Sequence, residues 1–222
     1  MSLGTLTRCL PCSLLIAASS LVAQSTVPIE NDQVKVIKAY EKPYERTPLH
    51  QHTVNRVMIY EQAGAQEFMD MKKKPYTLNF RAGEVKWSPG GAPHMARVVT
   101  PNPVPIVEIE LKKQGNPALW TPGALDPVKV DPKHYKVEFE NEQVRVLRVT
   151  IGPHEATPLH QHAVNRVVAY LSDQNFRVTP KEGKPEIAKH SAGDVSWSGP
   201  ALHKEENLSD KAFEVIVAEI KN

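Results

Sequence analysis

Six of the nine histidines in this 222-residue chain fall into two similar patterns whose spacing could hold metal ions. A His-Gln-His triplet occurs at residues 50–52 and again at 160–162, and one more histidine follows each triplet. Because residues i and i+2 of a β-strand point to the same side, each triplet would project two imidazoles together. Three neutral imidazoles that converge in a dry cavity can bind Zn, Fe, Mn, Ni or Cu and leave positions open for water or substrate. The candidate metal ligands are His50, His52, His94, His160, His162 and His203.

These patterns belong to an internal repeat that covers most of the sequence. Residues 30–60 and 140–170 are identical at 18 of 31 positions when the chain is shifted by 110 residues. The match continues through AGEVKWS (82–88) and AGDVSWS (192–198), and it ends with PIVEIELK (105–112) opposite EVIVAEIK (214–221). A repeat of this length indicates two copies of one domain. We expect domains at residues 28–112 and 133–222, joined by a proline-rich linker at residues 113–132 that packs on the surface.

Each copy shows the pattern of successive short strands. VKVIKAY (34–40) and VRVLRVT (144–150) alternate apolar and polar residues, as half-buried strands do. Other segments are rich in β-branched residues and are bounded by Pro, Gly, Asn or Asp. Since no convincing helical periodicity follows the N-terminal segment, the sequence predicts an all-β fold of two sandwiches or barrels, each of about 90 residues.

The N-terminal segment has the layout of a secretory signal peptide, which we place at residues 1–24. Arg8 is the only charge before Glu30, and an apolar run of small residues extends from position 9 to Ala23. The run is too short to span a bilayer comfortably. Cleavage is expected near Ala23 or Gln24, which predicts an exported protein, periplasmic or secreted. Both cysteines would be removed, so the mature chain would have no disulfide, thiolate metal site or cysteine nucleophile.

Charge and composition exclude several classes of partner. The 27 Lys and Arg residues nearly balance 25 Asp and Glu residues, and the basic residues are scattered. This distribution gives no electrostatic basis for binding nucleic acid, or a membrane surface after signal cleavage. We expect a small-molecule ligand and packing of the two barrels against each other within one chain. The sequence leaves open whether the chain also forms a homo-oligomer.

The region around the third histidine resembles the second motif of the cupin superfamily. That motif has a Gly, five residues, Pro-x-Gly, two residues and a His, and the segment from Gly83 to His94 fits it at every fixed position. The segment from Gly193 to His203 fits with its turn one residue shorter, and Asn207 falls on the closing Asn of the motif. The resemblance covers nearly all of the mature chain, twice. It implies a bicupin: two tandem double-stranded β-helix, or jelly-roll, barrels with a histidine cluster inside each.

The chain departs from the cupin pattern where the family places its metal-binding Glu. Asn55-Arg56-Val57 and Asn165-Arg166-Val167 stand there instead. Counting along the strand from His52, the inward positions are 54, 56, 58 and 60, so each arginine would face the pocket and each asparagine would face away, unless a bulge changes the register.

Four arrangements are compatible with this departure. Three histidines could hold the metal alone while Arg56 or Arg166 binds an anionic substrate. A bulge could instead bring the two asparagines in as weak fourth ligands. The site could have lost its metal and become an anion- or sugar-binding pocket. Alternatively, each arginine could reach the rim and pair with a carboxylate such as Glu108 or Glu142.

Other side chains have less distinctive predicted roles. Tyr60 and Tyr170 share the inward parity, and they could either offer a hydroxyl to substrate or serve in buried packing. Trp87 and Trp197 could form core packing or one wall of the pocket, and packing is favoured. The remaining histidines have no partner in the other copy and are expected at the surface: His134, His154 and His190.

Three functions follow from these observations. The first is a metal-dependent enzyme, an oxygenase, isomerase or decarboxylase that acts on a small polar or anionic molecule. The second is a non-catalytic protein that binds a small anion or sugar in the same pocket. The third is a structural bicupin with vestigial sites. Cupins host very different chemistries on one barrel, so the fold alone does not decide among them.

Overall fold

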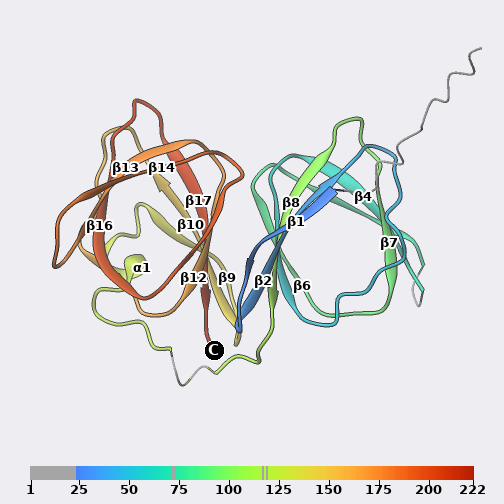
Figure 1. The fold of residues 1–222 in the computed structure, drawn as a ribbon, viewed down its shortest axis with the longest axis horizontal. Helices are drawn as coiled ribbons and strands as arrows, with labels where there is room; N and C mark the ends of the chain where they lie inside the picture. Colours follow the sequence, from blue (N-terminus) through green and yellow to red (C-terminus); the bar gives the residue numbers. More distant parts are fainter. Residues whose placement is uncertain (1–23, 72–73, 117, 119) are drawn as a thin grey trace, which may run out of the picture.

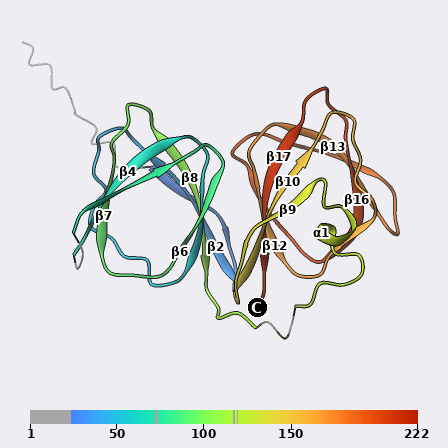
Figure 2. The ribbon, with the colours of Figure 1, turned by 180° about the vertical axis from the view of Figure 1, so that it is seen from behind.

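Two β-barrels lie side by side in the computed structural model, which describes residues 24–222 except 72–73, 117 and 119 (Figure 1). The view from behind shows the same arrangement (Figure 2). The all-β prediction is confirmed. The expected signal peptide lies outside the described residues except for Gln24, where the first strand begins. No helix within the described ranges is long and apolar enough to cross a membrane.

Barrel 1 is formed by two antiparallel sheets. Its strands are β1 (Gln24–Glu30), β2 (Val34–Glu41), β3 (Arg56–Tyr60), β4 (Gly64–Asp70), β5 (Tyr76–Phe80), β6 (Glu84–Ser88), β7 (His94–Val98) and β8 (Val104–Leu111). One sheet has the order β1-β2-β8-β3-β6 and the other β5-β4-β7. β1 thus begins before the predicted domain start at residue 28.

Barrel 2 repeats this arrangement with one more regular strand. Its strands are β9 (Tyr135–Glu140), β10 (Val144–Ile151), β11 (His160–His162), β12 (Arg166–Tyr170), β13 (Gln174–Pro180), β14 (Glu186–His190), β15 (Val195–Ser198), β16 (Ala201–Asn207) and β17 (Phe213–Ile220). The sheets have the orders β9-β10-β17-β12-β15 and β11-β16-β13-β14. The additional strand is β11, which holds the second His-Gln-His triplet.

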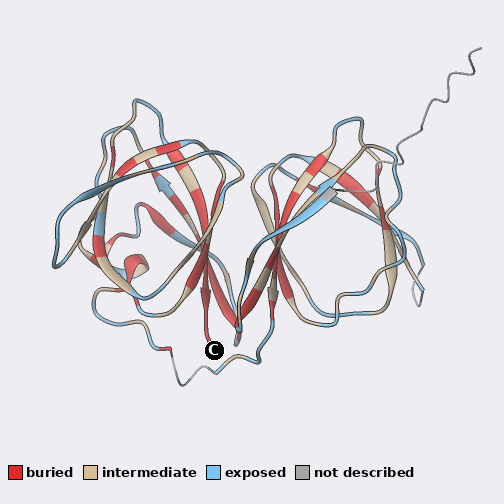
Figure 3. Ribbon diagram, in the orientation of Figure 1, coloured by how far each residue is buried: buried red, intermediate tan, exposed pale blue. Residues whose placement is uncertain are grey.

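The five-stranded sheets of the two barrels pack against each other. One apolar cluster joins residues of β2, β3 and β8 to residues of β10, β12 and β17, among them Val57, Ile109, Val146 and Ile220. Figure 3 shows the buried segments concentrated where the two barrels meet. Alternation along each strand therefore sends one set of side chains into this shared core and the other set into the barrel interior.

The segment between the barrels contains a short helix, α1 (Pro127–Val130), which the sequence analysis did not predict. The Asp126 side chain accepts a hydrogen bond from the Val128 amide, and Pro127 occupies the first turn, so both helix-start signals are present. A four-residue helix is too short to show apolar periodicity.

Candidate metal centres

The structure brings three histidines together inside each barrel. In each set, one potential ligand atom per side chain lies within 4.8 Å of the others, and the sets are His50, His52, His94 and His160, His162, His203. In barrel 2, β11 pairs with β16 so that His160 stands opposite His203. The predicted alternation of side chains is confirmed there, because both histidines of the triplet are buried and Gln161 is exposed.

The triplet of barrel 1 is less regular than predicted. Its backbone is not part of a regular strand, and only His50 forms an isolated bridge, with His94. The two backbones exchange hydrogen bonds of 3.0 and 2.9 Å, so the pair lies as in barrel 2. All three histidines are half-buried in barrel 1 and buried in barrel 2.

Hydrogen bonds fix the imidazoles that the triplets contribute. The Nδ1–H of His52 donates to Oε1 of Glu110 at 2.8 Å, and that of His162 donates to Oε1 of Glu219 at 2.7 Å. Because the carboxylates only accept, Nε2 of each ring keeps its lone pair for a metal.

Backbone carbonyls fix the other histidine of each triplet. His50 donates from Nδ1 to the carbonyl of Pro48 at 2.8 Å, and His160 donates to that of Pro158 at 3.0 Å. Both triplets therefore present Nε2 atoms to the metal position, each with an oriented ring.

Burial keeps most of these imidazoles neutral, which is the form that binds metal. It lowers the pKa of His94, His160 and His162, and it lowers that of His203 to about 2. Nε2 of His203 is buried without a hydrogen-bond partner, as expected of an atom that has a ligand still to bind. The residues present thus fit a divalent metal ion.

Glu219 remains ionised beside His162 although it is buried. Burial by itself would raise its pKa, but hydrogen bonds from His162 and Arg145 hold the pKa below its usual value. Arg145 donates from Nε to Glu219 at 2.6 Å and from Nη2 to Asp126 at 2.7 Å. A chain of charged groups thus orients the metal-facing ring of barrel 2.

Each histidine triad borders a cavity. Barrel 1 encloses about 480 Å³, and Arg56, Met58 and Tyr60 are among the lining residues. Barrel 2 encloses about 310 Å³, and Arg166, Val168 and Tyr170 hold the equivalent positions. The predicted inward parity of both arginines and both tyrosines is confirmed.

Known structures share this arrangement of strands. No protein-family model and no curated protein sequence matches the chain. AerE from Microcystis aeruginosa matches with a TM-score of 0.62 and 12% identity, covering 90% of this chain and 98% of that chain. Bacillus subtilis oxalate decarboxylase, in a structure whose Mn(II) centres were studied, matches with a TM-score of 0.61 and 15% identity, covering 90% of this chain and 72% of that chain. A cupin 2 conserved barrel domain protein from Leptotrichia buccalis matches with a TM-score of 0.56 and 12% identity, covering 93% of each chain.

The chain has the cupin fold, built twice. At these identities the likeness concerns the fold, and the site must be argued from the residues of this chain. In this chain, the glycines that open the segment resembling the second cupin motif make the turn before the strand that leads to the third histidine. Gly83 and Gly193 have φ values of 73° and 85°, a region that other residues rarely adopt.

The asparagines beside the inward arginines are not metal ligands. The Asn55 side chain donates to Gln143 at 2.6 Å, and the Asn165 side chain donates to Gln33 at 2.6 Å, in both cases across the junction of the barrels. β3 and β12 keep a continuous register with their neighbours, so the bulge that could have turned the asparagines inward does not form.

The arginines occupy the metal-ligand position of the cupin motif but do not reach the rim. Both are 6% exposed. Nη1 of Arg56 lies 3.5 Å from Oε2 of Glu108, so the pairing with Glu108 is correct although its expected place at the rim is wrong. Arg166 donates to the carbonyl of Gly199, and burial lowers its pKa.

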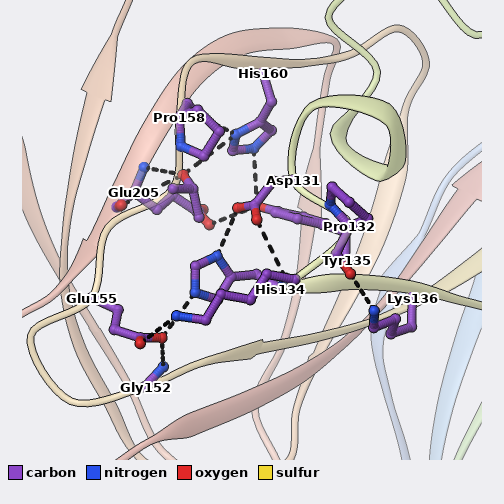
Figure 4. Close-up of polar contacts among 12 residues, drawn as sticks. Asp131, Pro132, His134, Tyr135, Lys136, Gly152, Glu155, Pro158, His160 and Glu205 are labelled. Carbon is purple, nitrogen blue, oxygen red and sulfur yellow. Dashed lines mark hydrogen bonds and ion pairs between the residues drawn. The ribbon is translucent and has the colours of Figure 1, made fainter.

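Two of the three histidines expected at the surface lie elsewhere. His134 is 5% exposed and lies between Asp131, at 2.7 Å, and Glu155, at 2.9 Å (Figure 4). His190 is half-buried and stacks on Tyr170, with the ring centroids 3.9 Å apart, in the wall of the barrel 2 cavity. His154 is exposed, as predicted.

The tryptophans pack as expected. Trp87 and Trp197 lie against the apolar cluster shared by the barrels. The Trp87 ring packs edge-on against Phe139 of the other barrel, with the ring centroids 6.1 Å apart. Trp87 also borders the barrel 1 cavity.

Several site residues were not found by the sequence analysis as site groups. Glu110 and Glu219 had a detectable signal, because they are the acids that coincide when PIVEIELK is aligned with EVIVAEIK. Glu205 and Tyr135 had none, since Ala96 and Ser25 stand at their counterparts in the first copy. Tyr135 is fully buried in barrel 2, and its hydroxyl lies 3.0 Å from Nε2 of His160.

Proposed function

We propose that this protein is an exported bicupin that binds a divalent transition metal at each histidine triad and a small anionic molecule beside the metal of barrel 1. The observation that supports this most strongly is the pair of convergent triads. The carboxylate and carbonyl partners of the triplet histidines occupy Nδ1, so Nε2 of each ring keeps its lone pair, although Nε2 of His160 also lies 3.0 Å from the Tyr135 hydroxyl. Neutral nitrogen donors of this kind suit Mn, Fe, Zn, Ni or Cu.

Barrel 1 is the better candidate for binding the anion. Its cavity of about 480 Å³ is the larger of the two barrel interiors. Nε and Nη1 of Arg56 are buried without a hydrogen-bond partner, so they have donors to offer a ligand. A guanidinium matches a carboxylate in geometry and charge. Arg166 in barrel 2 already donates to a backbone carbonyl.

The proposed activity is that of an oxygenase, isomerase or decarboxylase of the cupin type. A bound metal would supply Lewis-acid or redox chemistry. The chain itself would hold the anion through Arg56 and limit water through the apolar side chains around the cavity. Tyr60 lies in the same wall, where burial raises its pKa, so its hydroxyl stays protonated and can donate to the ligand.

The test is calorimetry of the Mn²⁺-loaded full chain with oxalate and acetate as probes. Arg56→Gln should weaken oxalate binding by about tenfold or more, the effect of losing a charged hydrogen bond, and leave the metal content unchanged. Arg97→Gln is the matched control, because Arg97 pairs with Glu67 near the surface. Equal oxalate affinity in the parent and in Arg56→Gln would contradict the role of Arg56.

Export is proposed from the N-terminal sequence alone. N-terminal sequencing of the mature protein from a secreting host should find a chain that begins at Gln24 or Ser25. A chain that keeps Met1 and stays inside the cell would contradict it.

A further inference from the structure

Each barrel interior combines a buried guanidinium with a metal site that has only neutral nitrogen ligands. A divalent cation and an arginine repel each other in such a low-dielectric space unless a negative charge lies close to both. In the cupin pattern that charge is the Glu that this chain replaces with Arg56 and Arg166. A carboxylate that reaches the histidines inside each barrel would supply this charge.

In barrel 1 the carboxylate of Glu108 lies between the arginine and the triad. Its Oε2 is 3.5 Å from Nη1 of Arg56 and 3.8 Å from Nε2 of His52, the atom that faces the metal position. Glu108 is 8% exposed, and this oxygen accepts no hydrogen bond. This oxygen is paired with Arg56 but has no hydrogen bond, so it can still bind a second cation in the interior.

In barrel 2 a different strand supplies the carboxylate. Glu205 follows His203 by two residues on β16, so both side chains point to the same side. Its Oε1 lies 3.9 Å from Nε2 of His203, which has no hydrogen-bond partner, and the Tyr135 hydroxyl lies 3.3 Å from Oε2. Figure 4 shows Glu205 and Tyr135 beside His160.

The two carboxylates stand at non-equivalent positions of the repeat. The aligned strands place Val217 opposite Glu108 and Ala96 opposite Glu205. Each barrel thus has a glutamate where the other has an apolar residue, and both have an arginine at the position of the motif Glu. This reciprocity is expected if each copy replaced the same missing function independently.

We propose that Glu108 in barrel 1 and Glu205 in barrel 2 are the fourth metal ligands. The inference rests on the proposed metal binding and names the oxygen donor that completes each triad. Each carboxylate lies beside one histidine of its triad, and the ion draws it inward. In barrel 1 this movement also releases Arg56 from Glu108, which frees the guanidinium for an anionic ligand.

The experiment measures Mn²⁺ affinity of each barrel separately, from the EPR signal of the free ion. In the full chain, His160→Ala/His162→Ala leaves barrel 1 alone, and His50→Ala/His52→Ala leaves barrel 2 alone. Glu108→Gln should raise the Kd of barrel 1 by about tenfold or more, since even supporting carboxylates have effects of this size. The same variant should leave the Kd of barrel 2 for Mn²⁺ within twofold of its parental value. Glu205→Gln should raise the Kd of barrel 2 by about tenfold or more and leave that of barrel 1 within twofold.

Two kinds of control test whether the two glutamates only neutralise the nearby arginines. One is a matched glutamate away from the triads, and the other is a background in which the arginine is replaced. Glu67→Gln and Glu206→Gln each remove a carboxylate that pairs with an arginine away from the triads, and both should bind Mn²⁺ like their backgrounds. If Glu108 merely neutralises Arg56, then Glu108→Gln should have no effect once Arg56 is replaced in Arg56→Met. We expect the tenfold loss to persist there, and likewise for Glu205→Gln in Arg166→Met.

The possible results separate this inference from the proposed function. Unchanged Mn²⁺ affinity in Glu108→Gln and Glu205→Gln, with both variants folded by circular dichroism, would overturn the inference and leave metal binding by three histidines intact. A parent chain that binds no Mn²⁺, Fe²⁺ or Zn²⁺ would overturn both. If Glu→Gln prevents folding, Glu→Asp keeps the charge beside the arginine, and a tenfold weaker affinity in it supports the inference while parental affinity contradicts it.

Discussion

A histidine that must bind metal has to remain neutral, and burial achieves this at His203. With 7% of its surface exposed and two further imidazoles nearby, it has a pKa of about 2, against about 6.5 in an unfolded chain. The unfolded state therefore takes up a proton below pH 6.5 that the native state does not. Stability from this group is fully present above pH 6.5 and is lost as the pH falls.

We predict that the metal-free protein loses about 2 kcal/mol of unfolding free energy between pH 7 and pH 5 through His203 alone. Urea unfolding in the presence of a chelator measures the unfolding free energy at each pH. Plotted against pH, this free energy should fall more steeply for the parent than for His203→Asn as the pH is lowered. The stability gap between the parent and His203→Asn should narrow by that amount over the interval. Parallel pH curves for the two proteins would show that His203 titrates normally in the native state.

Residue-level prediction succeeded where the repeat supplied two independent observations of the same side chain. The six histidines and the inward arginines recur in both copies, and strand parity then assigns their direction. Glu108 and Glu205 do not recur, and their proposed role as ligands depends on which strands face each other across the interior. His134 and His190 also lack counterparts, and their burial depends on packing that local sequence does not encode.

At the scale of the element, one strand start serves both the site and the junction of the barrels. Asn55 and Arg56 are neighbours at the beginning of β3, so the pleat turns the arginine into the cavity and the asparagine toward barrel 2. Asn55 also accepts a hydrogen bond from the Gly90 amide at 3.0 Å, in the turn that leads to the third histidine. Packing of the barrels and geometry of the site are therefore linked through this segment.

Asn55→Ala and Asn165→Ala should each lower the unfolding free energy by about 1–2 kcal/mol, because each removes the donor to the side-chain oxygen of a glutamine of the other barrel. Chemical denaturation measures the loss. Asn102→Ala is the control, since Asn102 is exposed in a loop. If the two junction variants are as stable as the control variant, the hydrogen bonds across the barrels contribute nothing measurable.

Most strands were predictable from alternation, β-branched residues and turn signals, whereas other elements were not. The sequence of α1 contains a capping aspartate and a proline, but a single turn has no periodicity to detect. The first triplet does not form a regular strand, whereas the second forms β11, although the local sequences are nearly identical. The difference therefore arises from tertiary pairing with other strands.

At the scale of the whole molecule, one apolar core spans both copies, so we expect them to fold as one unit. Ile109 is fully buried in this shared cluster, together with residues of β10 and β17. Separation of the barrels would expose a large apolar surface on each, so neither barrel is expected to unfold while the other remains native.

Thermal unfolding of the full chain should therefore show one cooperative transition. Ile109→Ala should cost about 3 kcal/mol through the cavity it leaves, and the transition should shift without splitting. Calorimetry tests this by comparing the van't Hoff and calorimetric enthalpies. Two resolved transitions, of which the variant shifts only one, would show that the barrels unfold independently.

The most direct test of metal binding by this protein is elemental analysis of the chain, produced in a secreting host and purified without a histidine tag. We predict two transition-metal ions per chain, one for each triad. His52→Ala and His162→Ala should each reduce the content to one, because each removes a ligand from a different barrel. A chain that holds no metal, even after incubation with Mn²⁺, Fe²⁺, Zn²⁺, Ni²⁺ and Cu²⁺, would contradict the account and favour a metal-free binding or structural bicupin.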